Sequence, residues 1–105
     1  MPETTVLEPH VEEVTKLAPN YHVVLLNDED HTYDYVIEML QNIFVFSRET
    51  AFRHAEEVDL TGRTVLITCE LGEAEYSRDQ IHAYGPDWRM PTSKSSMAAV
   101  IEPAG

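Results

Sequence analysis

The first half of the chain predicts one strand followed by two amphipathic helices. Residues 21–26, YHVVLL, are apolar and rich in β-branched side chains, as expected of a strand at the centre of a sheet. After Thr32, a candidate N-cap, apolar residues recur every three or four positions and predict a helix to about residue 44. Ser47 begins a second predicted helix, from residue 48 to about residue 59, whose inward stripe includes Phe52. Gly62 then ends this helix, because glycine adopts the left-handed conformation without steric cost.

The second half predicts a strand, a helix and a last strand. Residues 64–69, TVLITC, form the second predicted strand. Gly72 precedes a predicted helix over residues 73–84, which Gly85 and Pro86 end. A long polar loop over residues 85–96 leads to a short apolar strand at residues 97–101. The order β-α-α-β-α-β predicts an α+β fold, with a small three-stranded antiparallel sheet and three helices on one face.

Composition divides the chain into an extension and a folded core. Residues 1–19 are acidic, contain Pro2, Pro9 and Pro19, and have too few large apolar side chains to fold alone. We therefore expect a flexible acidic N-terminal extension over residues 1–19 and a core domain over residues 20–105. The 105-residue chain has a formal net charge of -12, which repels phosphate backbones and anionic membranes. Neither nucleic acid nor a membrane is an expected partner.

Cysteine usage and the N-terminus indicate the cellular setting. Cys69 is the single cysteine of the sequence, so no internal disulfide can form, and its apolar neighbours predict a buried thiol. The N-terminus lacks the basic and apolar regions of a secretory signal. We expect a cytoplasmic protein.

The motifs of common metal sites and enzymes fail at the positions that matter. Acidic and hydroxyl side chains alternate over residues 28–34, as in a calcium loop, but Tyr33 and Met39 occupy the required glycine and glutamate positions. The five histidines show no HExxH spacing, and no serine lies in a GxSxG elbow. We expect no metal, no cofactor and no enzymatic activity.

The polar residues after the first strand leave two interpretations open. Asn27, Asp28 and Glu29 can make an Asx turn and cap the next helix. Alternatively, their oxygens can accept hydrogen bonds from a protonated amine, which has three N–H donors and needs no metal-like geometry. The pattern alone favours the turn over the amine site.

Several segments in combination resemble the ClpS family. These segments are the apolar strand followed by Asn27-Asp28-Glu29, then YVIEMLQ at residues 35–41, the helix end at residues 57–59, and Gly62-Arg63 before a strand. Members of this family are adaptors that bring proteins with destabilising N-terminal residues to a Clp AAA+ unfoldase and its protease. The resemblance covers residues 20–84 well and the last strand less well. It implies a compact α+β domain behind an extension that engages the unfoldase.

The resemblance also implies a site for the first residue of a substrate. Its α-amine would be held by Asn27, Glu29 and Asp59, with Asp28 beside them. The side chain of the substrate residue would enter an apolar pocket formed by Tyr33, Val36, Ala55, Val58 and Met97. The implied partners are N-terminal peptides and the N-domain of the unfoldase, and we expect the protein to be a monomer.

This sequence departs from the family pattern inside that site. Asp59 stands where the family has an amine-binding histidine, and Glu29 stands where an aspartate is usual. Ala55 and Tyr33 each occupy a position that is often methionine. These departures predict an adaptor with an altered N-terminal residue preference. The alternative is a regulatory protein that docks on an AAA+ unfoldase without binding N-termini, which the loss of the histidine favours.

Overall fold

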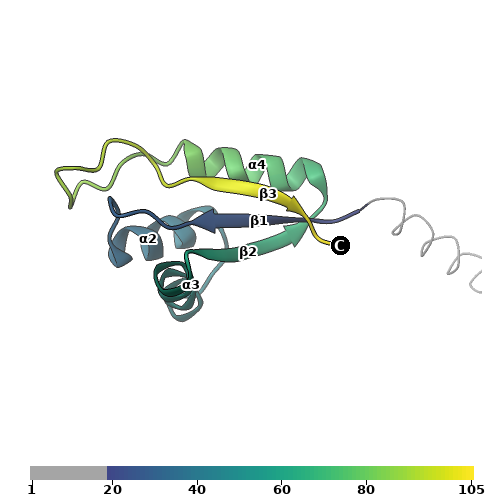
Figure 1. Ribbon diagram of the computed structural model, residues 1–105, viewed down its shortest axis with the longest axis horizontal. Coiled ribbons are helices and arrows are strands. Elements are labelled where there is room, and N and C mark those ends of the chain that lie inside the picture. The colour runs from purple at the N-terminus through teal and green to yellow at the C-terminus, as the bar shows by residue number, and fades with distance from the viewer. Residues whose placement is uncertain (1–18) are drawn as a thin grey trace, which may run out of the picture.

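The central strand of the sheet comes from the start of the core, and its two neighbours come from the second half of the chain. The computed structural model describes residues 19–105, which contain β1 (Tyr21–Leu26), α2 (Tyr33–Ile43), α3 (Arg48–Thr61), β2 (Arg63–Cys69), α4 (Leu71–His82) and β3 (Ala99–Pro103) (Figure 1). The strands are antiparallel in the order β2-β1-β3. The predicted α+β fold is confirmed. Residues 1–18 of the predicted extension lie outside the described residues.

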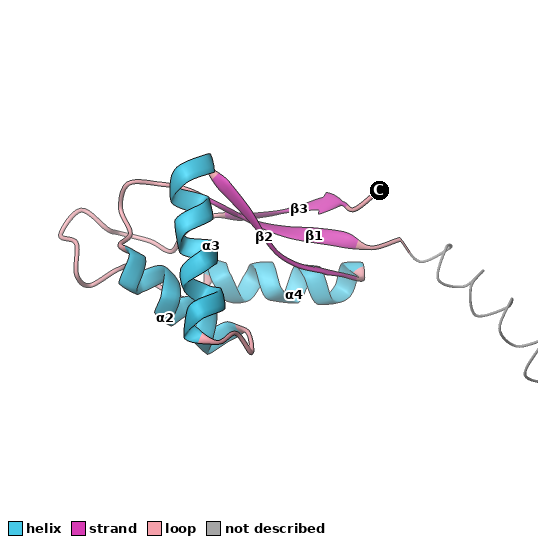
Figure 2. Cartoon of the chain, turned by 90° about the horizontal axis from the view of Figure 1, so that it is seen from below, coloured by secondary structure: helices cyan, strands magenta, loops and turns pink. Residues whose placement is uncertain are grey.

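The helices pack against one face of the sheet. Figure 2 shows α2 and α4 below the strands, with α3 standing across one end. Helix α4 contacts all three strands, and α3 packs on α2 and β2. Val23 and Leu25 of β1 are fully buried and join Met39, Leu40 and Ile81 from the helices in the hydrophobic core. Among the described residues, no helix is long and apolar enough to cross a membrane.

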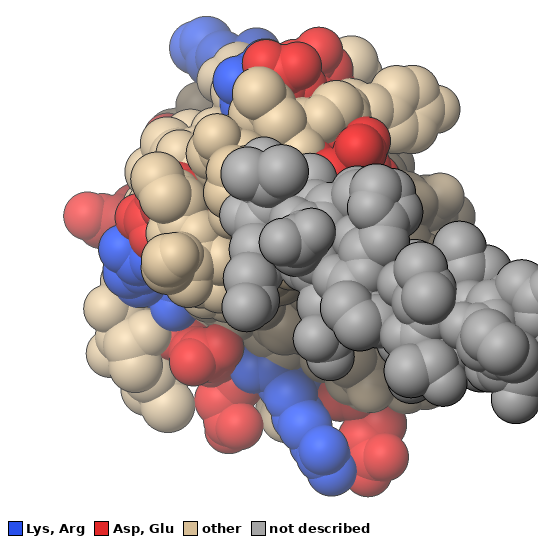
Figure 3. All heavy atoms as spheres, turned by 90° about the vertical axis from the view of Figure 1, so that its right-hand side faces the viewer, with Lys and Arg blue, Asp and Glu red and all other residues tan. Residues whose placement is uncertain are grey.

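On the opposite face of the sheet, Val24 of the central strand lies between Val65 of β2 and Val100 of β3, which are each 38% exposed. Val24 points away from the core because side chains alternate along a strand, yet it is fully buried. Arg63 on β2 and Glu102 on β3 form an ion pair of 2.7 Å, which crosses over β1 because β1 lies between them. The end of the molecule where β1 begins carries acidic and basic side chains interspersed around the grey atoms (Figure 3).

Capping residues set the helix boundaries much as the sequence predicts. The hydroxyl of Thr32 accepts a hydrogen bond from the backbone of Tyr35, and Ser47 does the same for Thr50 at the start of α3. Gly62 ends α3 with a φ angle of 93°, in the left-handed region. The three predicted caps are therefore confirmed.

Four local predictions are wrong by small margins. Cys69 is partly exposed and not buried. Helix α4 begins at Leu71 with Glu70 as its N-cap, so Gly72 lies inside the helix instead of preceding it. Strand β3 begins at Ala99, because residues 97 and 98 still belong to the loop, and Met97 therefore reaches the core from a loop. Phe52 is 43% exposed and does not belong to the inward stripe of α3.

The glycines at residues 62 and 72 give opposite expectations for substitution by alanine. We expect Gly62→Ala to lower the free energy of unfolding by about 1 kcal/mol, because a Cβ atom is strained at positive φ. Gly72→Ala is the matched control. It should raise the free energy of unfolding by up to about 1 kcal/mol, because alanine favours helix and its Cβ meets only the movable end of Glu70. Urea unfolding of both variants checks this; equal effects would contradict the role of the left-handed turn.

Candidate functional site

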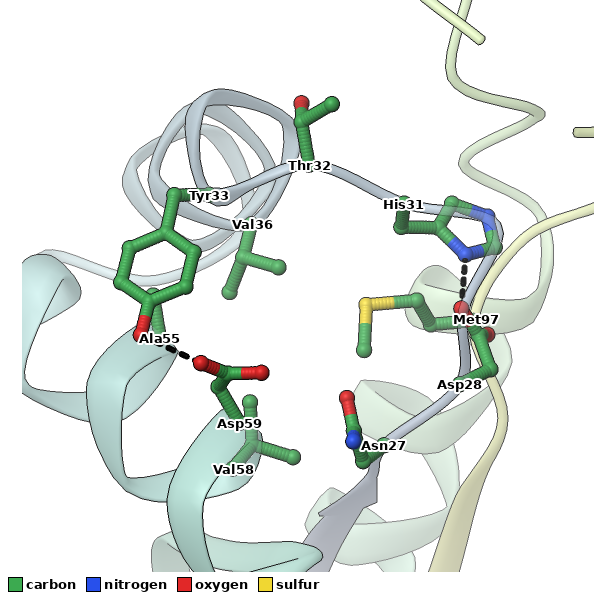
Figure 4. Close-up of a pocket in the computed structure, with 10 residues that line it drawn as sticks. All are labelled: Asn27, Asp28, His31, Thr32, Tyr33, Val36, Ala55, Val58, Asp59 and Met97. Atoms are coloured by element: carbon green, nitrogen blue, oxygen red, sulfur yellow. Dashed lines mark hydrogen bonds and ion pairs between the residues drawn. The ribbon is translucent and has the colours of Figure 1, made fainter. Parts of the chain in front are cut away.

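A pocket opens where the end of β1 meets α2, α3 and the loop before β3 (Figure 4). Together with the open solvent at its mouth, it spans about 290 Å³ of space that no protein atom occupies. The lining combines apolar, amide, hydroxyl, imidazole and carboxylate side chains from Asn27, Asp28, His31, Thr32, Tyr33, Val36, Ala55, Val58, Asp59 and Met97. The pocket thus joins segments that are far apart in the sequence.

Four buried apolar side chains form the floor of the pocket. Val36 comes from α2, Ala55 and Val58 come from one face of α3, and Met97 comes from the loop before β3. Ala55 and Val58 are three residues apart, so they lie side by side on the helix surface. Ala55 contributes only a methyl group to this floor, so it fills less space than a larger apolar side chain would.

Asn27 and Asp59 supply polar groups from two sides of this floor. The backbone N–H of Asn27 donates to the carbonyl oxygen of Gly62 at 3.0 Å, which fixes Asn27 beside the end of α3. Figure 4 shows the Asn27 side chain pointing into the space that Asp59 faces from α3. Within residues 19–105 the Asn27 side chain makes no hydrogen bond. Its amide is therefore available to a ligand.

Tyr33 contacts Asp59 across the mouth of the pocket. The Tyr33 hydroxyl donates to Asp59 Oδ2 at 2.8 Å, and the tyrosine ring lies 5.9 Å from the ring of Phe52. This hydrogen bond, together with partial burial and the charges of Asp59 and Glu56, raises the pKa of Tyr33. The hydroxyl therefore keeps its proton near neutral pH and acts as the donor.

Asp28 turns toward His31 on the other side of the pocket. Asp28 Oδ1 accepts from the backbone N–H of Asp30 at 2.9 Å and lies 2.7 Å from His31 Nδ1. His31 Nε2 lies 2.7 Å from the carbonyl oxygen of Ser95, and the imidazole packs 4.5 Å from the ring of Tyr35. The histidine therefore ties residues 27–32 to the long loop before β3.

Asp87 fastens the same loop to the start of α2. Its carboxylate is almost fully buried and accepts from the backbone N–H and the hydroxyl of Thr32, at 2.7 and 2.8 Å. Its other oxygen accepts from the backbone and guanidinium of Arg89, at 3.0 and 3.2 Å. Burial alone raises the pKa of Asp87, but these hydrogen bonds outweigh it and lower the pKa to about 2. The loop is thus a fixed wall beside the pocket.

The structure brings together all but one of the residues expected from the sequence. Asn27, Asp28, Asp59, Tyr33, Val36, Ala55, Val58 and Met97 line the pocket. Glu29 is exposed and does not line it. The residue pattern does not predict His31 as part of the site, and it predicts Thr32 only as a helix cap. The pairing of His31 with Asp28, three residues away, is a local signal, whereas its second partner, Ser95, lies on a distant loop.

The chemistry of the lining suits a small cationic head attached to an apolar group. Amide and carboxylate oxygens at the mouth accept hydrogen bonds, and the floor beneath them is apolar. Among residues 19–105, no three His, Cys, Asp or Glu side chains lie close enough to hold a metal ion together. Fold and pocket together define a small α+β domain with an apolar pocket floor beneath a polar mouth.

The chain belongs to the ClpS family. Residues 16–91 match the family described as ATP-dependent Clp protease adaptor protein ClpS. The ClpS adapter of Nautilia profundicola is 40% identical over 82 residues, which cover 78% of this chain and 82% of that protein. The adapter of a Synechococcus strain is 29% identical over 82 residues, covering 77% of this chain and 90% of the relative. The family resemblance seen in the sequence is confirmed.

A solved structure shares the fold. ClpS2 of Agrobacterium tumefaciens, bound to L-phenylalaninamide, superposes with a TM-score of 0.70 at 26% sequence identity, covering 82% of this chain and 98% of that one. Membership in the ClpS family links this chain to protein degradation by the Clp protease. The family consists of adaptors of the protease and not of catalytic subunits.

Proposed function

We propose that this protein binds the free N-terminal residue of substrate proteins, the N-degron, and delivers them to a Clp AAA+ unfoldase. The observation that carries the proposal is the pocket itself, in which the polar groups of Asn27 and Asp59 stand over a buried apolar floor. An N-terminal residue has the same two parts, a protonated amine and a side chain. No catalytic step is part of this role.

The amine is bound by hydrogen-bond acceptors at the mouth of the pocket. An α-ammonium group has three N–H donors, and the Asn27 carbonyl oxygen and the cavity-facing oxygen of Asp59 accept two of them. Asp28 lies beside them, with one oxygen occupied by His31 and Asp30 and the other available. Because one partner is an ionised carboxylate, these are charge-assisted hydrogen bonds.

The first side chain of the substrate enters the hollow between Val36, Ala55, Val58 and Met97. These residues are buried and apolar, so they favour a large apolar side chain over a small or charged one. The ligand of the Agrobacterium relative supports this assignment, because L-phenylalaninamide is an amino-acid amide with a free amine and an aromatic side chain. We infer a preference for bulky apolar residues, adjusted by the space that Ala55 leaves.

The remaining parts of the proposal concern delivery. We propose that residues 1–19 form a flexible extension that engages the unfoldase, while residues 20–105 form the binding core, which docks as a monomer on the N-domain of the unfoldase. We expect the protein to act in the cytoplasm.

Peptides with free and blocked N-termini test the proposal. Fluorescence anisotropy of the full chain with peptides beginning with Phe, Leu, Trp or Tyr should show that N-terminal acetylation weakens binding about 100-fold for the preferred residue, because it removes the charge and two of the three donors. The same peptides beginning with Gly or Asp are the control for the apolar hollow, and they should bind weakly.

Equal affinity for free and acetylated peptides would reject amine recognition. If such a protein still bound the N-domain of an unfoldase, the result would favour the alternative function, a regulator that docks on the unfoldase without binding N-termini. The presence of Asp59 in place of the family histidine is the observation that favours this alternative function.

A further inference from the structure

Tyr33 and Asp59 come from different helices and meet at the mouth of the pocket. Tyr33 is the first residue of α2, and Asp59 lies two residues before the last residue of α3. We propose that Tyr33 is a positioning residue of the amine site, whose hydroxyl holds the Asp59 carboxylate so that its second oxygen faces Asn27. This inference rests on the proposed binding of N-terminal residues.

The geometry supports positioning in preference to blockage. The Tyr33 hydroxyl donates a hydrogen bond only to Oδ2 of Asp59, at 2.8 Å. The other carboxylate oxygen points into the cavity in Figure 4. A carboxylate has about four lone-pair sites, so one O–H donor leaves most of its accepting capacity free. Among the described residues, no hydrogen bond uses Asp59 Oδ1. The hydrogen bond therefore orients the carboxylate and leaves Oδ1 free to accept a hydrogen bond from a ligand.

Asp59 needs an external partner to hold this orientation. Its side chain is exposed, and it lies near the C-terminal end of α3, where the helix dipole disfavours a negative charge. A carboxylate in this place would otherwise turn toward solvent. Tyr33 offers a rigid donor, because its ring packs against Phe52 at 5.9 Å and its hydroxyl retains its proton.

A tyrosine that orients the carboxylate also selects what the site binds. The oriented oxygen complements a compact ammonium group that reaches Asn27 at the same time, whereas an acetylated N-terminus has no positive charge to match it. Tyr33 therefore acts on discrimination between free and blocked N-termini, and not on the apolar hollow.

The substitution Tyr33→Phe tests this role. It keeps the ring against Phe52 and removes only the donor. We expect the affinity for a free N-terminal Phe peptide to fall about fivefold, a modest loss because the lost hydrogen bond affects the peptide only through the orientation of Asp59. The affinity for the acetylated peptide should not change, so the ratio between the two peptides shrinks. Tyr76→Phe, on an exposed tyrosine of α4, is the matched control and should leave both affinities unchanged.

A double-mutant cycle separates positioning from packing. In an Asp59→Ala background, Tyr33→Phe should have no further effect on the free peptide, because the hydroxyl then has nothing to orient. An additive effect in that background, or an equal loss for both peptides, would mean that Tyr33 acts through packing and would overturn the inference. Tighter binding by Tyr33→Phe would also overturn it, because the hydrogen bond would then be a latch that competes with the amine.

The wild-type protein distinguishes the two ways of failing. If the wild-type protein binds free peptides far better than acetylated ones, and the Tyr33→Phe variant has the same two affinities, only the positioning role is wrong. If the wild-type protein does not discriminate, the proposed function fails, and the positioning role fails with it.

Discussion

Reversing the charge at residue 59, with Asp59→Lys, is expected to weaken binding of a free N-terminal Phe peptide by about 100-fold. The substitution removes an acceptor and places an ammonium group where the ammonium group of the peptide binds. A charged hydrogen-bond partner in such a contact contributes on the order of 2 to 3 kcal/mol to binding, and 2.7 kcal/mol is about 100-fold. Isothermal titration calorimetry at physiological salt measures the change, and the acetylated peptide should show little of it.

Glu75→Lys is the matched control for this prediction. Glu75 is exposed on α4, which contributes no residue to the pocket, and the substitution changes the net charge by the same amount. Its affinity should remain within about twofold of the wild type, because salt screens exposed charges beyond about 10 Å. Equal losses in both variants would show that the overall negative field of the protein, and not a contact at residue 59, attracts the peptide.

Replacing Asp87 with asparagine is expected to cost about 2 kcal/mol of unfolding free energy near neutral pH. The carboxylate accepts four hydrogen bonds from Thr32 and Arg89. The amide of an asparagine at this position points its NH₂ group at one of the two pairs of hydrogen-bond donors. It also lacks the negative charge that strengthens the hydrogen bonds from the other pair. For a domain of this size the thermal midpoint should fall by about 10 °C, which differential scanning calorimetry can measure.

The pH dependence of this effect has a definite sign. The pKa of Asp87 is lowered from 3.8 to about 2 in the folded protein, so ionisation of Asp87 stabilises the fold above the unfolded value. The difference between wild type and Asp87→Asn should therefore be full above about pH 4 and should shrink as the pH falls toward 2. Asp30→Asn, on an exposed side chain, is the control. A difference that stays constant from pH 6 to 2 would contradict the carboxylate as the cause.

Much of the fold follows from local chemistry that is visible in the sequence. The apolar run of residues 21–26 forms the central strand, and Thr32, Ser47 and Gly62 mark helix ends through caps that act within a few residues. The errors also have local causes. Gly72 lies in the first turn of α4 and not before it, because one glycine costs a helix only about 1 kcal/mol and does not by itself set where the helix begins.

The residues of the pocket floor are predictable because helical spacing and the family resemblance both indicate them. Ala55 and Val58 share a face of α3 for the reason that any residues three apart do. Their function as a pocket for a substrate side chain stays a prediction. Glu29 shows the limit of reasoning by sequence position, because it follows Asp28 in the chain yet lies outside the lining.

The sequence by itself determined the succession of strands and helices along the chain and three of the helix caps, and its resemblance to the ClpS family implied the residues of the apolar floor. Only the tertiary structure decided which polar groups face one another: Tyr33 with Asp59, His31 with Ser95, and Thr32 with Asp87. The physical reason is the distance along the chain over which each kind of interaction acts. Caps and periodicity act over three or four residues, whereas these side chains meet only after the sheet and helices have packed and brought distant segments together.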